Sequence, residues 1–386
     1  MNNLIKPLGG VLTPLLVDET EKSYYLNYAE TLPRVAVSSR EENDIYMMGI
    51  GGFTPLTGFI NHDDWLNVCE HYQLTNGTFW PLPITLSTDN VTAKSIIINS
   101  DIALARENKI IAIMNVTEKY KINKTYECLN IYQTIDHNHP GVKAIMSQGE
   151  VNLAGSIKVL RLGNAPKKHA DYFLTPAQTR AEFNSRGWKT ITAFQTRNPI
   201  HRAHEHLIQQ ALDKTDGVLI HSILGKLKTG DIPASIRLKA IQTLIDNYYK
   251  NAPIIQAGYP LDMRYAGPRE ALLHAVFRQN YGCSHLIIGR DHAGVNNYYK
   301  PFASQEIFKE IPKNSLKIKT INMDLTFWCN SCNDITTDKK CNHSSKDKLI
   351  YSGTMLRNDL EKNIKISSKF SRPEVISVLR EYYNNT

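Results

Sequence analysis

The sequence predicts an α/β protein built from three parts, for which we expect residues 1–165, 166–325 and 326–386 to form separate domains. A chain of 386 residues is too long for one ordinary hydrophobic core. Short segments rich in β-branched residues fill the first part, strand and helix patterns alternate in the second, and cysteines gather in the third. We therefore expect a mostly-β N-terminal domain, a central doubly wound parallel sheet and a small C-terminal α/β domain.

In the first part, three segments between turn-forming residues are predicted to be strands: PLPITLSTD, KIIAIMNVTEKY and SIKVLRL. The segment GGFTPLTGF at 51–59 is shaped by glycine and proline, and we expect a rigid loop that packs its two phenylalanines.

The central part alternates between apolar strands and helical patterns, which is typical of a parallel sheet covered on both faces. The predicted strands are 189–194, 217–224, 253–258, 285–288 and 316–321. The predicted helices are 199–213, 233–249, 268–280 and about 303–311. Ligands of such sheets bind outside the carboxyl ends of the strands, so polar residues at those ends are candidate site residues.

The third part contains the pattern Cys329-x2-Cys332-x8-Cys341-x-His343. These four ligands suit tetrahedral Zn²⁺ and leave no open position, so we expect a structural zinc site. The other cysteines, Cys69, Cys128 and Cys283, are scattered and are interpreted as buried thiols. Further on, a capping-box pattern beginning at Ser371 predicts a terminal helix.

The composition, 42% hydrophobic and 21% charged, is that of a globular protein. No stretch reaches the roughly 18 apolar residues of a membrane span, and the N-terminus lacks a signal-peptide pattern. We expect a cytoplasmic protein with no membrane partner. The formal charge of +8 favours anionic partners, which include nucleotides, inorganic oxyanions and nucleic acid.

The densest polar stretch is FQTRNPIHRAHEHLI at 194–208, where a predicted strand gives way to a helix. Asn198 and Pro199 form a good N-cap and first-turn pair, so we expect the helix to start at Pro199. At about 100° per residue, His204 falls within the apolar stripe and His201 at its edge, whereas His206 points to solvent. The stripe itself consists of Ile200, Ala203, Leu207 and Ala211.

This stretch is suited to binding an anion. A helix N-terminus favours negative charge, and two inward imidazoles can donate hydrogen bonds to phosphate oxygens. Gln195, Thr196 and Arg197 lie in the preceding loop, where the fork of an arginine matches a tetrahedral oxyanion. A single inward histidine would more often be an ordinary core residue, but two beside these donors favour a site.

A second polar loop, GRDHAGV at 289–295, follows the predicted strand 285–288 and should reach the same edge of the sheet. Its glycines allow the backbone to approach a ligand closely. The side chains of Arg290, Asp291 and His292 supply donors and acceptors, and Ala293 leaves its N–H accessible. A third stretch, MRYAGPREA at 263–271, places Arg264 and Arg269 at a helix start, where they form part of a site or are simply solvated.

Together these motifs resemble the ATP sulfurylase family, in its bacterial type with a zinc cluster and without a fused kinase domain. The resemblance runs along essentially the whole chain and is carried by QTRNPIHRAHE, MRYAGPREA, GRDHAG, SGTMLR, FSRPEV, PLTGF and HPGV. It implies a PUA-like N-terminal domain and a central nucleotidyltransferase domain. It also implies the conversion of ATP and sulfate to adenylylsulfate and pyrophosphate by direct in-line attack of sulfate on the α-phosphorus, or the reverse, and it leaves the physiological direction open.

The resemblance also implies roles for individual residues. Sulfate would be held by Gln195, Arg197 and Ala293. The catalytic residues would be Thr196, Arg197, Asn198, His201 and His204, the two histidines contacting the phosphates. ATP would contact Gln195, Asn198, His201, His204, Gly289, Arg290, Asp291 and His292. Mg²⁺ would accompany ATP, and the protein would be a homo-oligomer, with a dimer favoured.

One flank departs from the family pattern: Lys300, Ala303 and Ser304 follow the GRDHAG loop where other residues are common in the family. Because this flank lies beyond the catalytic motifs, we expect it to affect the local shape of the loop more than the function. The chain also carries no GxxxxGK[ST] loop, so a fused kinase domain is not expected.

Two alternatives remain. A different nucleotidyltransferase would act on a phosphorylated or carboxylic acceptor, but its site would not need the GRDHAG loop. A nucleic-acid-binding protein with a β module and a zinc knuckle is compatible with the positive charge. It is disfavoured because the sequence has no basic stretch interleaved with aromatic residues.

Overall fold

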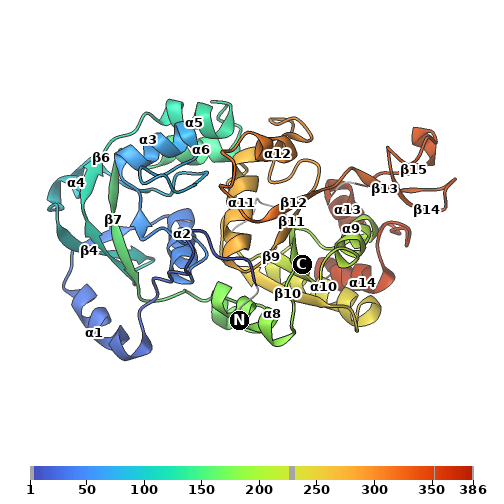
Figure 1. The fold of residues 1–386 in the computed structure, drawn as a ribbon, viewed down its shortest axis with the longest axis horizontal. Coiled ribbons are helices and arrows are strands. Elements are labelled where there is room, and N and C mark those ends of the chain that lie inside the picture. The colour runs from blue at the N-terminus through green and yellow to red at the C-terminus, as the bar shows by residue number, and fades with distance from the viewer. Residues whose placement is uncertain (1–3, 226–230, 352, 385–386) are drawn as a thin grey trace.

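The computed structural model describes residues 4–225, 231–351 and 353–384, the side chain of Thr354 excepted. Its strands form three sheets that follow one another along the chain (Figure 1). No helix among the described residues is both long and apolar enough to cross a bilayer.

The first sheet has seven strands in the order β1-β4-β5-β7-β2, with β3 and β6 also paired to β7. Pairing is antiparallel except between β1 and β4. The strands are β1 (Arg34–Ala36), β2 (Gly58–Phe59), β3 (Leu86–Thr88), β4 (Ser100–Arg106), β5 (Lys109–Val116), β6 (Glu118–Tyr120) and β7 (Val151–Val159). The helices around them are α1 (Glu19–Glu30), α2 (Ser39–Gly49), α3 (His62–His71), α4 (Asn90–Ser95), α5 (Lys124–Tyr132) and α6 (Pro140–Ser147).

This part contains the predicted sheet, with helices packed around it. The GGFTPLTGF loop buries both of its phenylalanines, Phe53 and Phe59, as predicted. Of the segment PLPITLSTD only its last part forms a strand, β3, because its two prolines interrupt the ladder of backbone donors.

The second sheet is parallel throughout and has the order β10-β9-β8-β11-β12. Its strands are β8 (Ile191–Thr196), β9 (Gly217–Ile223), β10 (Ile254–Tyr259), β11 (His285–Ile288) and β12 (Lys319–Asn322). The helices are α7 (Ala165–Lys168), α8 (Pro176–Ser185), α9 (Arg202–Leu212), α10 (Ala234–Tyr248), α11 (Pro268–Asn280) and α12 (Ala303–Glu306), the last continued by a 3₁₀ turn, Ile307–Lys309.

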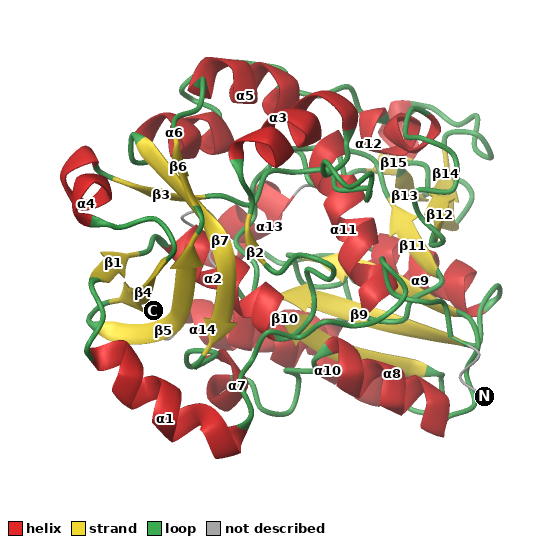
Figure 2. Ribbon diagram, turned by 60° about the vertical axis from the view of Figure 1, so that its left-hand side comes forward, coloured by secondary structure: helices red, strands yellow, loops and turns green. Residues whose placement is uncertain are grey.

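Helices cover both faces of this sheet, which confirms the doubly wound architecture (Figure 2). On one face, Phe194 and Ile220 pack with apolar residues of α9 and α10. On the other face, Ala193 and Leu219 pack with residues of α8 and α11. The chain runs outward from β8 in one direction and returns to β11 on the other side, so a crevice opens at the carboxyl ends of β8 and β11.

Helix α11 lies between the N-terminal part and the central sheet (Figure 1), and all of its residues are buried. Leu272 and Leu273 belong to the apolar cluster of the N-terminal part, whereas Ala271 and Ala275 belong to the cluster beneath the central sheet. Because every side of this helix faces protein, its polar side chains need partners within the molecule.

The third sheet is antiparallel, with the order β14-β13-β15. Its elements are β13 (Thr326–Cys329), β14 (Asp334–Thr337) and β15 (Lys348–Leu349), with a 3₁₀ turn at Ser345–Asp347. Two helices follow, α13 (Gly353–Glu361) and α14 (Pro373–Asn384), and Ser352 of the SGTMLR motif lies outside the described residues. Apolar residues of α13 and α14 share one cluster with α9 and α10, so the end of the chain packs directly on the helix that follows β8.

Candidate functional site

The two polar loops predicted from the sequence line one cavity of about 300 Å³. Strand β8 ends at Thr196, so Gln195 and Thr196 lie in the strand and not in the loop expected for them, and Arg197 and Asn198 follow it. Residues 289–293 follow β11, so both stretches lie at the crevice where the connections diverge. His204 of α9 and Met263, which precedes α11, complete the wall between the loops.

The first loop is held by a turn of its own. The Thr196 hydroxyl donates to the Asn198 carbonyl at 2.6 Å and accepts from the Asn198 N–H at 3.0 Å. Arg197 therefore projects from the middle of a closed turn. Its guanidinium lies 5.4 Å from the ring centre of Tyr265 and donates one long hydrogen bond of 3.4 Å to the Gly294 carbonyl in the second loop.

Several polar atoms of this loop are buried without a protein partner. Among the described residues, Nη1 of Arg197 and Oε1 of Gln195 have no hydrogen-bond partner. A buried guanidinium nitrogen without a partner is costly unless something else accepts its hydrogen bond. A polar ligand that accepts a hydrogen bond from Arg197 would satisfy this nitrogen.

The predicted start of the helix is wrong. Helix α9 begins at Arg202, three residues later than expected, and its N-cap is His201 rather than Asn198. The reason is that Thr196 already takes the Asn198 backbone into its turn, and the Arg202 N–H donates to the distant Phe370 carbonyl at 2.8 Å. That N–H is therefore not free to bind an anion, contrary to the expectation for an open helix N-terminus.

The two inward histidines are brought together as predicted. Their rings stack at 3.8 Å between centres, and Nδ1 of each is buried without a hydrogen-bond partner among the described residues. Burial lowers the pKa of His204 to about 4, against the opposing effect of the Pro199 carbonyl. Burial, and then the neighbouring His204, lower the pKa of His201 well below its usual value. Both rings are neutral at pH 7, so each has one N–H to donate and no charge to contribute.

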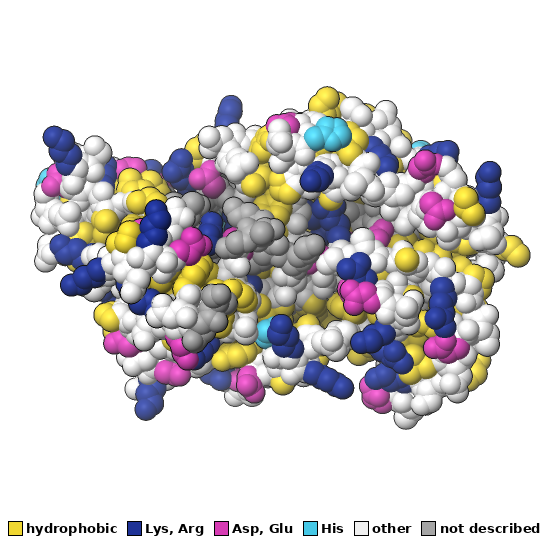
Figure 3. All heavy atoms as spheres, turned by 180° about the vertical axis from the view of Figure 1, so that it is seen from behind, with side chains coloured by type: hydrophobic (Ala, Val, Ile, Leu, Met, Phe, Trp, Pro, Cys, Tyr) yellow, Lys and Arg dark blue, Asp and Glu magenta, His cyan; other side chains and the backbone are white. Residues whose placement is uncertain are grey.

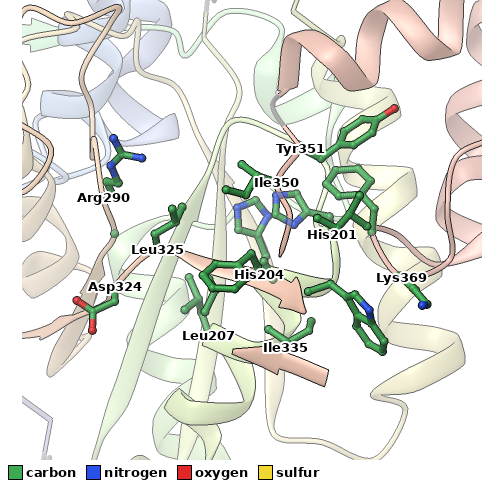
Figure 4. A pocket seen from close by; sticks show the side chains of 17 residues that line it. His201, His204, Leu207, Arg290, Asp324, Leu325, Ile335, Ile350, Tyr351 and Lys369 are labelled. Atoms are coloured by element: carbon green, nitrogen blue, oxygen red, sulfur yellow. The ribbon is translucent and has the colours of Figure 1, made fainter. Parts of the chain in front are cut away.

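His201 does not line the cavity described above. It lies in an adjoining cavity of about 230 Å³, which shares His204, Gly289 and Arg290 with the first one. Figure 4 shows the two imidazole rings lying against each other, with Arg290 on the opposite side and Tyr351 and Lys369 approaching from the C-terminal part. The chain beyond residue 324 therefore forms one wall of the site, which the local sequence pattern did not reveal.

The second loop has an unusual backbone. Asp291 and Ala293 both have positive φ values, 54° and 57°, and a side chain in this left-handed region costs energy that the surroundings must offset. Two contacts hold the loop from the flank that departs from the family pattern: the Asp291 N–H donates to the Pro301 carbonyl at 2.8 Å, and the Ser304 hydroxyl donates to the His292 carbonyl at 2.8 Å. That flank therefore contacts the loop directly.

The arginines of MRYAGPREA are buried, so their interpretation as solvated side chains at a helix start is wrong. Arg264 forms an ion pair of 2.6 Å with Asp44, and Arg269 donates to the carbonyls of Val68 and Pro81 at 2.9 and 3.2 Å. Both connect the start of α11 to the N-terminal part. Neither belongs to the residues that line the cavity between the two loops.

His206 is half-buried, so the expectation that it points to solvent is also wrong. Burial lowers its pKa, and charges on Lys340 and Asp334 of the C-terminal part act on its ring. The helical pattern correctly predicted that His206 faces away from the cavity. It could not predict that a later part of the chain covers that face of α9.

The four predicted metal ligands lie together. Their ligand atoms all fall within 4.8 Å of one another, with 3.7 Å between the sulfurs of Cys332 and Cys341. Nδ1 of His343 lies 3.3 to 3.5 Å from the three sulfurs. A tetrahedral ion with metal–sulfur bonds of about 2.3 Å requires ligand separations of about 3.8 Å, so the arrangement fits a small four-coordinate metal ion.

One face of the molecule bears on the alternative of nucleic-acid binding. On the face shown in Figure 3, Lys and Arg side chains are scattered, with acidic side chains between them. Several of the exposed cations are paired, such as Lys239 with Glu381 at 2.9 Å.

Comparisons with known proteins agree with this arrangement. The ATP-sulfurylase family profile matches residues 170–382, and a PUA-like domain profile matches residues 5–162. The sulfate adenylyltransferase of Thiobacillus denitrificans is 53% identical over 99% of this chain and 95% of its own length. That of Ruthia magnifica is 51% identical over the same shares. The solved structure of a hexameric APS kinase from Thiobacillus denitrificans has the same fold, with a TM-score of 0.77 at 23% identity over 98% of this chain and 68% of its own.

Proposed function

The chain belongs to the ATP sulfurylase family, and from that premise we propose that it converts ATP and sulfate to adenylylsulfate and pyrophosphate, or catalyses the reverse reaction. The observation that carries this proposal is the cavity shared by the loops after β8 and β11, with its unpartnered arginine nitrogen. An anion whose oxygens accept hydrogen bonds is the ligand such a cavity requires.

In the forward direction, a sulfate oxygen attacks the α-phosphorus of ATP, a new P–O bond forms, and the bond to the β-phosphate breaks as pyrophosphate leaves. Sulfate is a weak nucleophile, and no covalent enzyme intermediate is needed. The protein has to hold two anions that repel each other in line and to stabilise the charge of the transition state.

We assign sulfate to Gln195, Arg197 and the backbone N–H of Ala293, which lie on facing walls of the cavity. Arg197 supplies the positive charge. The Thr196 hydroxyl is engaged in the turn with Asn198, so it supports the loop and leaves substrate contact to its neighbours.

We assign the phosphates of ATP to His201 and His204, each of which donates one N–H as a neutral ring. Asn198 and the loop from Gly289 to His292 would hold the rest of the nucleotide. Asp291 is the only carboxylate among the described residues that line the cavity, so Mg²⁺ would be bound mainly by the phosphates and water. The ion would neutralise part of the phosphate charge.

We propose Zn²⁺ as the ion of the cluster Cys329, Cys332, Cys341 and His343, because thiolates and imidazole in a closed tetrahedral set select it. Its role would be structural, since no ligand position is open. A homo-oligomer, with a dimer favoured, and a cytoplasmic location stay predictions from the sequence.

The decisive experiment measures ATP formation from adenylylsulfate and pyrophosphate, with each substrate omitted in turn. ATP should form only when both are present. In the forward direction, pyrophosphate release from ATP should depend on sulfate. Release that is independent of sulfate, or that requires a carboxylic acceptor, would indicate a different nucleotidyltransferase.

A further inference from the structure

Helix α11 carries two titratable side chains that the proposed mechanism does not use. Glu270 and His274 are one helical turn apart and fully buried, so they lie above one another on the same side of the helix. Buried titratable groups need polar partners. Here the contacts extend from Glu270 through His274 to His292 in the GRDHAG loop.

The three side chains form a chain of contacts that ends at the cavity. Nδ1 of His274 lies 3.0 Å from Nε2 of His292, and Nε2 of His274 lies 3.6 Å from Oε1 of Glu270. The Glu270 carboxylate in turn accepts the N–H of Arg264 at 2.9 Å and the N–H of Ala266 at 3.1 Å.

The charges decide which nitrogens carry protons. Burial lowers the pKa of His274 and of His292 well below the usual value, and nearby arginines act in the same direction, so both rings are neutral with one N–H each. Burial is the largest influence on Glu270 and leaves its pKa raised, although two backbone N–H donors and the Arg264 guanidinium oppose that shift. With each oxygen accepting an N–H, Glu270 acts as an acceptor toward His274.

An acceptor facing Nε2 of His274 repels a lone pair and attracts a proton, even at 3.6 Å. Nε2 of His274 is therefore protonated, and its Nδ1 carries the lone pair. His292 must then donate its Nε2–H across the 3.0 Å contact, which leaves Nδ1 of His292 without a proton.

We propose that Glu270 and His274 are positioning residues that hold His292 in its Nε2–H form, so that the ring presents an accepting Nδ1 to the nucleoside. Sulfate and the α- and β-phosphates of ATP carry no proton to donate at neutral pH, whereas a nucleoside has an amino group and ribose hydroxyls. His292 lines the same cavity as Arg197, and it would favour the nucleoside end of ATP over either anion. This assignment rests on the proposed function and specifies how one residue orients the substrate.

The loop backbone is held independently of these rings. The Gly267 N–H donates to the Ala293 carbonyl at 3.1 Å, and the Ser304 hydroxyl donates to the His292 carbonyl at 2.8 Å. Substituting His274 should therefore change the orientation and protonation of the His292 ring while leaving the course of the loop unchanged.

The direct test is the protonation state of His292 in the wild-type protein. Long-range ¹H–¹⁵N correlation spectra of histidine-labelled protein distinguish the two neutral forms, and His292→Gln assigns the signal among the 13 histidines. We expect Nε2–H. An Nδ1–H form in the ligand-free protein would overturn the proposal, whether or not the protein makes ATP from adenylylsulfate.

The kinetic test compares His274→Leu with His274→Asn, whose amide oxygen can accept near the position of Nδ1. We expect His274→Leu to raise the KM for the nucleotide about 5- to 10-fold, the scale of one hydrogen bond, with the KM for sulfate or pyrophosphate within twofold. His274→Asn should restore most of the loss. Equal increases in both KM values would show a merely structural role and would contradict the proposal.

His221 provides the matched control. It is fully buried in β9, and both of its ring nitrogens lack hydrogen-bond partners among the described residues. We expect His221→Leu to leave the ratio of the two KM values unchanged. The same nucleotide-specific effect in both variants would attribute it to the loss of any buried histidine and refute the positioning role.

Discussion

Replacing Arg372 with methionine should lower the free energy of unfolding by about 2–3 kcal/mol, because it leaves a buried carboxylate without its cation. Arg372 precedes α14 and donates to both oxygens of Glu205 in α9, with distances of 2.8 to 3.1 Å. The Glu205 side chain is only 6% exposed, whereas that of Arg372 is 25% exposed. This ion pair joins the C-terminal part to the helix that carries His204.

The magnitude follows from the burial of the two partners. Breaking a fully buried ion pair costs about 3–5 kcal/mol. Water reaches part of Arg372, and the guanidinium of Arg202 remains 3.7 Å from the orphaned carboxylate, so the cost should fall below that range. Converting Glu205 to Gln in the same chain removes the stranded charge and should recover at least half of the loss.

Urea unfolding at pH 7, followed by circular dichroism, measures the change. The control is Lys239→Met, because Lys239 pairs with Glu381 across α10 and α14 at 2.9 Å with both side chains more than half exposed. An exposed pair contributes about 0–1 kcal/mol. If Arg372→Met costs no more than Lys239→Met, the C-terminal part is not held on α9 by this contact.

The same tether supports the site, because the Phe370 carbonyl accepts the Arg202 N–H and the Phe370 ring lies 4.8 Å from that of His201. We therefore expect Arg372→Met to lower kcat for ATP formation, whereas Lys239→Met should leave it unchanged. Unchanged kcat in the folded Arg372 variant would show that His201 is positioned by α9 alone.

Four further predictions concern the site and the metal cluster. Arg197→Ala should lower turnover at least ~10²-fold, the scale of losing one charge-stabilising donor, and activity within twofold of wild type would refute the assignment. Cys332→Ser should reduce bound zinc to well under one ion per chain by atomic absorption, and full retention would reject this ligand set. His206→Gln should leave turnover within about twofold, because His206 lies outside the cavity, even though it is half-buried. Folding lowers the pKa of His204 from 6.5 to about 4, so between these pH values the unfolded chain binds a proton at His204 and the folded chain does not. The free energy of unfolding is therefore unaffected by this group above pH 6.5 and decreases as the pH falls toward 4. The urea midpoint of His204→Gln should fall less between pH 7 and pH 5 than that of wild type, and parallel declines would contradict the assigned burial.

The sheet of the central part could be predicted because its signals are local. Each strand is a short apolar run, and the helix after Gly267 begins at Pro268 as the sequence indicates, since proline fits a first turn without a free N–H. The two site loops follow β8 and β11, and parallel topology alone places both at one edge. The order of strand, loop and helix was therefore enough to predict that both loops line one crevice.

The start of α9 could not be predicted because its cause is not local. Asn198 and Pro199 form a favourable cap by sequence, but the Thr196 hydroxyl donates to the Asn198 carbonyl, which would otherwise accept the first hydrogen bond of the helix. The first N–H of the actual helix is taken by Phe370, which lies more than 150 residues further along the chain. A contact between residues so far apart in the sequence cannot be predicted from the local hydrophobic periodicity. His206 was misplaced for the same reason, since the face of α9 that looked solvated is covered by the C-terminal part.

The burial of the polar residues on α11 could not be predicted from the sequence pattern either. The sequence PREALLHAVFRQN predicts a helix with one solvent-exposed face. In the structure, however, Arg269, Glu270 and His274 are buried like the leucines beside them. Their roles depend on what meets each one: backbone carbonyls of the N-terminal part for Arg269, and the GRDHAG loop for His274. The i,i+4 spacing of Glu270 and His274 was the available signal, and it required the knowledge that the helix has no exposed face.

The placement of hydrogen-bond donors and acceptors determines the orientation in which the nucleotide would bind in the proposed reaction. A group that meets sulfate or the α- and β-phosphates of ATP must donate, because these anions carry no proton at neutral pH. Arg197 is always a donor, and the neutral rings of His201 and His204 each have one N–H. In the proposed arrangement, Glu270 and His274 on α11 hold the proton of the neutral His292 ring on Nε2, so its Nδ1 is an acceptor. A nucleotide bound with its phosphates at His292 would therefore meet a lone pair instead of a proton. The proposed arrangement accordingly places the nucleoside at His292 and the phosphates at His201 and His204, with sulfate between Arg197 and the Ala293 N–H.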